Sequence, residues 1–210
     1  MKKYFAFAMV GMLALATQSF AATQAAGAAT VSPTLQISAT IQKAVSLTLS
    51  TGTTAPNHCA VTPGGGDYTM NFGDVDALGI SNGNCNKIAP QAPGSDNAIY
   101  WSDYTITPVY TGHTGFSATT ITAQVTSDFA APHNIFVVRS STATSSTLPS
   151  VSGDFTALNT AWVDTIGTAV ASGTALTRFI GVSVTPLNSA APAALQGLQS
   201  ATVTFTLTVL

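Results

Sequence analysis

Residues 201–210, ATVTFTLTVL, alternate apolar and hydroxylated side chains without a break. Successive side chains of a β-strand point to opposite faces, so one face of this segment is apolar and the other is mostly threonine. Such alternation predicts a half-buried strand with one face on a core and one face in solvent. The same period of two recurs at residues 45–49, 68–72, 104–110, 121–125, 135–138 and 180–184.

Turn-forming residues separate these segments. Clusters of Gly, Pro, Asn and Ser fall at residues 62–67, 79–86, 90–97, 112–115, 140–153 and 186–192. One short helical candidate, residues 190–198, is limited by Pro192 and Gly197. The pattern predicts an all-β fold, an antiparallel immunoglobulin-like or jelly-roll β-sandwich of about seven to nine strands.

Composition narrows the class of protein. The chain has 210 residues, of which 46% are hydrophobic and 7% are charged, and its formal net charge is -2. This apolar content supplies one buried core, and the weak charge excludes an acidic or basic disordered chain. Only 6 residues are Lys or Arg. We therefore expect neither nucleic acid nor an anionic membrane surface as a partner, because both need clustered cations.

The N-terminus has the three parts of a secretory signal peptide. Basic residues at positions 2–3 precede an apolar run over residues 4–17, and Ser19-Phe20-Ala21 forms a small-x-small cleavage site. The apolar run is shorter than the roughly 20 residues that span a bilayer. We expect a signal peptide over residues 1–21, an N-terminal extension over 22–34 and a single β-sandwich domain over 35–210. The mature protein is expected in the periplasm, at the cell surface or outside the cell, without a membrane span.

Cys59 and Cys85 are the only cysteines. An exported chain with two cysteines is expected to join them in a disulfide. A metal site that includes His58 is disfavoured, because His58 and Cys59 are adjacent and cannot easily face one ion together. The sequence predicts no metal site and no cofactor.

The first part of the mature chain holds an overlong alternating tract. Its apolar side chains share one parity from residue 31 to residue 49, and Lys43 interrupts them. One strand of that length would span about 60 Å, roughly three times a usual strand, so the tract is better divided into strands over residues 35–41 and 45–49. Two interpretations stay open. The tract crosses between the two sheets of one sandwich as a single bent strand, or its leading part pairs with a neighbouring subunit. The strand-donation candidates are Leu35, Ile37, Ala39 and Ile41.

Several of these features occur together in one kind of exported protein. They are the signal peptide, the alternating segment 35–41, the early Cys59, the segment Asn71-Phe72-Gly73-Asp74-Val75 and the Thr-rich final strand. In this layout the chain resembles exported bacterial fimbrial and spore-coat-U-like subunits. The resemblance implies an immunoglobulin-type sandwich, complete or incomplete, that assembles by strand addition into pili or coats. The expected function is that of a secreted structural or adhesive surface protein whose partners are its own copies or other surface subunits.

Catalytic motifs are poorly supported. Residues 79–83, Gly-Ile-Ser-Asn-Gly, match G-x-S-x-G, but that motif needs a preceding strand and a following helix to expose its serine. Asn84-Cys85-Asn86 follows instead, so a turn is favoured. We predict that the protein is not an enzyme.

Acidic and histidine residues give no clearer site. Glu is absent, and the closest carboxylates, Asp74 and Asp76, fit neither a glycosidase pair nor an EF-hand, although they leave a calcium site open as an alternative. His58, His113 and His133 lie far apart in predicted loops, where solvated histidines are usual.

Trp101 carries the alternative function. In the segment of residues 99–110, Tyr100, Tyr104 and Tyr110 share one face while Trp101 lies on the other. A tryptophan on an open face can stack on a sugar ring, which would make the protein a secreted carbohydrate-binding module with a glycan as its partner. The other interpretation is that residues 140–153 fold over this face and bury the ring.

Overall fold

The computed structural model describes residues 36, 38–39, 44–92, 96–111, 119–130, 134–140, 147–161, 163–186 and 197–209. The chain divides into two units, residues 1–40 and 41–210. Of the first unit the structure describes Gln36, Ser38 and Ala39, which are exposed and lie outside any strand.

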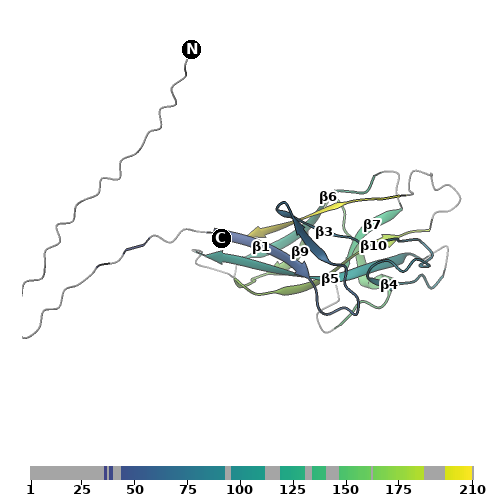
Figure 1. Ribbon diagram of the computed structural model, residues 1–210, viewed down its shortest axis with the longest axis horizontal. Coiled ribbons are helices and arrows are strands. Elements are labelled where there is room, and N and C mark those ends of the chain that lie inside the picture. The colour runs from purple at the N-terminus through teal and green to yellow at the C-terminus, as the bar shows by residue number, and fades with distance from the viewer. Residues whose placement is uncertain are drawn as a thin grey trace, which may run out of the picture. The chain divides into compact units, whose positions relative to one another are not determined.

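The described part of the second unit contains eleven strands (Figure 1). In chain order they are β1 (Ala44–Thr51), β2 (Val61–Gly64), β3 (Asp67–Met70), β4 (Asn86–Ile88), β5 (Ala98–Thr111), β6 (Thr120–Ser127), β7 (Ile135–Ser140), β8 (Phe155–Ala157), β9 (Asp164–Thr168), β10 (Leu176–Val184) and β11 (Thr202–Thr208). A single 3₁₀ turn, η2 (Ser152–Asp154), precedes β8 within the described residues.

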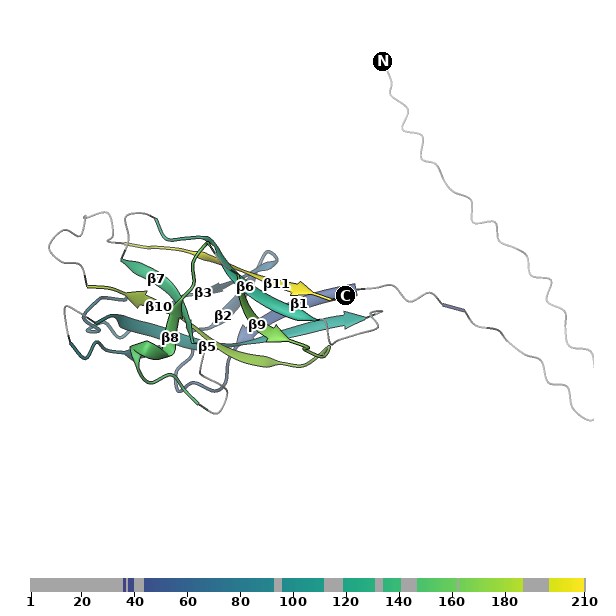
Figure 2. The ribbon, with the colours of Figure 1, turned by 180° about the vertical axis from the view of Figure 1, so that it is seen from behind.

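The strands form two large sheets and one hairpin, and all pairs are antiparallel (Figure 2). The first sheet has the order β1-β5-β10-β7-β8, with β4 also paired to β5. The second has the order β11-β6-β9, and β2 pairs with β3. Buried side chains of both large sheets meet in shared clusters. The predicted all-β antiparallel sandwich is confirmed.

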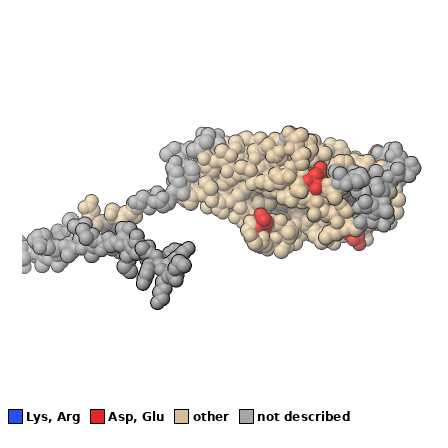
Figure 3. Space-filling model, turned by 90° about the horizontal axis from the view of Figure 1, so that it is seen from above, with Lys and Arg blue, Asp and Glu red and all other residues tan. Residues whose placement is uncertain are grey.

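Charged side chains are sparse on the surface. The face shown in Figure 3 is mostly uncharged, with scattered acidic residues. This distribution follows from a composition in which Thr and Ser occupy most polar strand positions.

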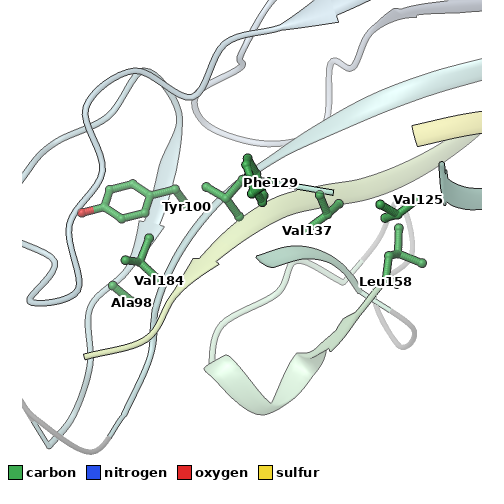
Figure 4. Close-up of a cluster of buried hydrophobic side chains, with 8 residues drawn as sticks. Ala98, Tyr100, Val125, Phe129, Val137, Leu158 and Val184 are labelled. Atoms are coloured by element: carbon green, nitrogen blue, oxygen red, sulfur yellow. The ribbon is translucent and has the colours of Figure 1, made fainter. Parts of the chain in front are cut away.

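The inner faces of the sheets form the main core. One cluster, shown in Figure 4, joins Tyr100 and Val182 of the first sheet to Val125 of the second. A second inter-sheet cluster contains Tyr104, Ile106, Ile121 and Val170. A third cluster lies on the other side of the first sheet and contains Ala55, Ile99, Trp101, Val138 and Phe179. Strand β5 is therefore buried on both faces over its first half.

The sequence located seven of the eleven described strands, including the four-residue β3. Seven of the eight segments with an alternating pattern lie in or overlap a strand, from β1 to β11. Of the eighth, residues 35–41, the structure describes Gln36, Ser38 and Ala39, which lie outside any strand. The additional strands are β2, β4, β8 and β9, which raise the number above the predicted seven to nine. Residues 62–67, expected to be a turn, instead form most of the β2–β3 hairpin. Its two-residue turn is Gly65-Gly66 with φ of 60° and 103°, a conformation that glycine adopts without strain.

The predicted helix at residues 190–198 lies mostly outside the described residues, and the question of a membrane span can be answered for the described residues alone. Of the helical candidate at residues 190–198, only Gly197 and Leu198 are described, and neither is helical. Among the residues that the structure describes, no helix has the length and hydrophobicity of a membrane span.

Candidate functional site

Strands β1 and β11 are the outermost strands at one edge of their sheets. Among the described residues, β1 pairs only with β5 and β11 pairs only with β6. Each strand therefore has one backbone edge without a strand partner in the described part of the chain. The start of β1 and the end of β11 lie at the same end of the unit, so the two strands run in opposite directions (Figures 1 and 2).

Both edge strands place apolar side chains against the same buried cluster. Leu47 and Leu49 of β1, and Phe205 and Leu207 of β11, pack on the cluster around Tyr104. All four are only half-buried, whereas Ile121 of the central strand β6, in the same cluster, is fully buried. We call these four side chains, with the outer backbone edges of their strands, the β1–β11 edge. It combines unpaired strand edges with incompletely covered apolar side chains.

The predicted strand-donation residues lie largely outside the described residues. Leu35, Ile37 and Ile41 are among those that the structure does not describe, and Ala39 is exposed and outside any strand. The second part of the tract is confirmed as β1, in which Leu47 and Leu49 face the core as the parity predicted. Val45, on the same parity, is 57% exposed.

The predicted disulfide between Cys59 and Cys85 is present. Their Cα atoms are 5.1 Å apart, and both residues are buried. The bond ties the segment after β1 to the segment before β4. It fits a protein that matures in an oxidising compartment.

His58, expected to be a solvated loop residue, is instead paired with a buried carboxylate. Its Nδ1 lies 2.7 Å from Oδ1 of Asp103, a residue of β5 that is 0% exposed. The backbone N–H groups of Thr54 and Ala55 donate to Oδ2 of the same carboxylate at 2.6 and 3.1 Å. This cluster could not be predicted from local sequence patterns, because its parts are separated by more than forty residues. The other two histidines, His113 and His133, lie outside the described residues.

Ser81 of the G-x-S-x-G sequence lies in a turn anchored by Asp76. The Asp76 carboxylate accepts hydrogen bonds from the backbone N–H groups of Leu78, at 2.7 Å, Ile80, at 3.1 Å, and Ser81. Partial burial alone would raise the pKa of Asp76, but these hydrogen bonds outweigh it and hold that pKa well below its ordinary value.

The same turn bears on the calcium alternative. The carboxylate oxygens of Asp76 are already used by backbone donors, and Asp74 is exposed. Within the described residues, no group of three or more His, Cys, Asp or Glu side chains is placed to hold a metal ion.

Trp101 lies in the core cluster on the outer side of the first sheet. It is 4% exposed, and its ring centroid is 5.7 Å from that of Phe179 and 6.3 Å from that of Phe155. The face that the sequence left open is thus covered, partly by residues just beyond the loop proposed to cover it. Trp101 also borders an open polar groove of about 640 Å³, and four asparagines line this groove: Asn57, Asn82, Asn84 and Asn86.

A scan against family models and searches of curated proteins and solved structures find no match to this chain.

Proposed function

We propose that this protein is a non-enzymatic structural subunit of the cell surface or extracellular space that self-associates by β-strand addition at the β1–β11 edge. The observation that carries the proposal is that two edge strands, each with one side lacking a strand partner among the described residues, lie on one apolar cluster. An added strand supplies backbone hydrogen bonds to an open edge, and its alternate side chains supply apolar contacts.

The proposed occupant is the segment of residues 35–41 from a second copy. Leu35, Ile37, Ala39 and Ile41 share one parity, so an extended segment presents them on one face. Gln36 and Ser38 fall on the opposite face and suit solvent. The segment contains no charged residue, and neither β1 nor β11 contains one, so little ionic surface is desolvated when they meet.

The disulfide is consistent with assembly in an oxidising compartment, such as the cell exterior. Cys59 and Cys85 are joined within one chain, so they remain unavailable for links between subunits. Subunit contacts would then be non-covalent and depend on the strand edge itself.

The test uses two pairs of variants in the mature chain. Leu207→Asp and Ile37→Asp place a charge on the proposed apolar contact from the acceptor and the donor side. Thr206→Asp and Ser38→Asp place the same charge one residue away, on the exposed face of each segment. Sedimentation velocity is expected to show oligomers for the wild type and both controls, and monomers for the two test variants. A monomeric wild type, or equal behaviour of all four variants, would contradict strand addition.

Carbohydrate binding is the second candidate, and the polar groove favours it. Asparagine amides are suited to sugar hydroxyls because each offers donors and an acceptor. Asn82 lines the groove and is exposed. Binding on a glycan array that is lost in Asn82→Ala would support this candidate. Trp101→Ala is a poorer test, since the ring is part of a buried cluster.

A further inference from the structure

Both arginines of the chain, Arg139 and Arg178, border a cavity between the two sheets. Arg178 of β10 pairs in register with Tyr104 of β5, and Arg139 of β7 pairs with Ile180. Tyr104 and Ile180 belong to the inter-sheet cluster, so these register positions face the second sheet. The cavity measures about 280 Å³.

Arg139 is neutralised inside this cavity. Its Nη2 donates to Oδ1 of Asp164 at 2.6 Å, and its Nε lies 2.6 Å from Oδ2. This ion pair, with one hydrogen bond from Nη2 to Oδ1, neutralises the carboxylate, which is almost fully buried. Among the described residues that line the cavity, Asp164 is the only acidic one.

Arg178 is fixed in place without being neutralised. Its Nε and Nη2 donate to the carbonyl oxygen of Ile166 at 2.8 and 2.5 Å, and its Nη1 donates to the carbonyl of Thr177 at 2.8 Å. Carbonyl oxygens orient a guanidinium but carry no net charge to cancel its own. A guanidinium has five N–H donors, so two remain beyond these three bonds. Within the described residues, no carboxylate forms an ion pair with Arg178.

The cavity therefore contains two guanidinium groups and one carboxylate, which leaves one positive charge in excess. Arg178 is half-buried, so its charge is partly withdrawn from water and an opposite charge beside it would be favourable. Tyr104 adds a neutral hydroxyl, since a phenol is protonated at neutral pH and burial raises the pKa of Tyr104 further. Much of the remaining lining is apolar, including Leu158, Ile180 and Phe205.

We propose that this cavity binds a small organic carboxylate, whose charged group pairs with Arg178 and whose short apolar part contacts the inter-sheet side chains. A single negative charge matches the single excess positive charge, whereas a doubly charged phosphate would overcompensate it. Guanidinium groups recognise carboxylates through paired N–H donors, and the two remaining donors of Arg178 suit that chemistry. This inference does not depend on strand addition, although Phe205 lines the cavity and also belongs to the β1–β11 edge.

Isothermal titration of the wild-type chain with butyrate tests the proposal, with butyramide as an uncharged ligand of similar shape. Saturable binding of butyrate at one site is expected, with little or no binding of butyramide. The proposal would be overturned if butyrate showed no saturable binding, or if butyrate and butyramide bound equally well. This first test needs only the wild-type protein.

Two charge-matched variants then locate the site. Arg178→Gln is expected to weaken butyrate binding about tenfold or more, since it removes the charge-assisted hydrogen bonds. Lys87→Gln is the control, because the Lys87 ammonium is also held by carbonyl oxygens, those of Gly79 at 2.7 Å and Ser81 at 3.0 Å, but outside the cavity. Equal losses in the two variants would show a nonspecific effect of net charge and would reject the site. Near-ultraviolet circular dichroism verifies that both variants remain folded.

Discussion

Asp103 organises the backbone around it through one fully buried carboxylate. Its Oδ2 atom accepts hydrogen bonds from the N–H groups of Thr54 and Ala55, and its Oδ1 atom pairs with the ring of His58. These contacts tie β5 to the segment after β1. Gly52 permits this approach, because a Cβ atom there would lie 2.2 Å from Cγ of Asp103. Only glycine fits at such a distance.

Replacing this carboxylate is expected to be costly. Asp103→Asn keeps the shape but offers an NH₂ group where N–H donors now converge, so buried donors lose their acceptor. We expect the free energy of unfolding to fall by about 3 kcal/mol, measured by urea denaturation. Asp67→Asn, at an exposed position beside the β2–β3 turn, is the control and should change little. Equal effects of the two substitutions would mean that the Asp103 cluster is not a stabilising unit.

At the scale of elements, alternation of side chains predicted the longer strands because each has one face on a core. Strand β11 follows the prediction fully: its valine, phenylalanine and leucine face inward and its threonines are exposed. Short strands such as β4, Asn-Lys-Ile, and β8, Phe-Thr-Ala, are held by pairing with a longer neighbour. Three residues are too few to show a period, so the sequence could not reveal them.

The candidate site could be predicted from the sequence only in part, because it depends on contacts between distant segments. The overlong tract and the final strand were visible as patterns, and both supply a strand of the β1–β11 edge. That these two strands meet on one cluster depends on the order of strands in each sheet, which local periodicity does not encode. The buried Asp103 and the arginine cavity likewise arise from contacts between distant segments.

The turn of residues 76–81 is an element whose stability should depend on pH. The Asp76 pKa is lowered by folding, so its contribution is present above the ordinary value of 3.8 and is lost as the pH falls through the folded value. Asp76→Asn is expected to cost about 1–2 kcal/mol at neutral pH. Urea denaturation of wild type and variant should show this difference shrinking in acid. A difference that stays constant or grows as the pH falls would exclude Asp76 as the source.

At the scale of the whole molecule, a weakly charged surface and an open strand edge together favour association between copies. Edge strands in monomeric proteins are commonly guarded by charged residues, proline or a covering segment. Neither β1 nor β11 contains a charged residue or a proline. We therefore expect copies of the protein to associate through the β1–β11 edge.

Covalent trapping between two different chains is a direct test of association through the β1–β11 edge. One chain carries Ile37→Cys and the other Leu207→Cys, and the two are mixed under mild oxidation, with the native Cys59–Cys85 bond intact. We expect intact-mass spectrometry to detect a mixed covalent dimer. This dimer should form far more readily than when Ser38→Cys replaces Ile37→Cys as the control. The contradicting result has two parts: no mixed dimer forms, and a single chain with both substitutions closes an internal disulfide instead. That result would exclude strand addition between copies and would place residue 37 on its own domain.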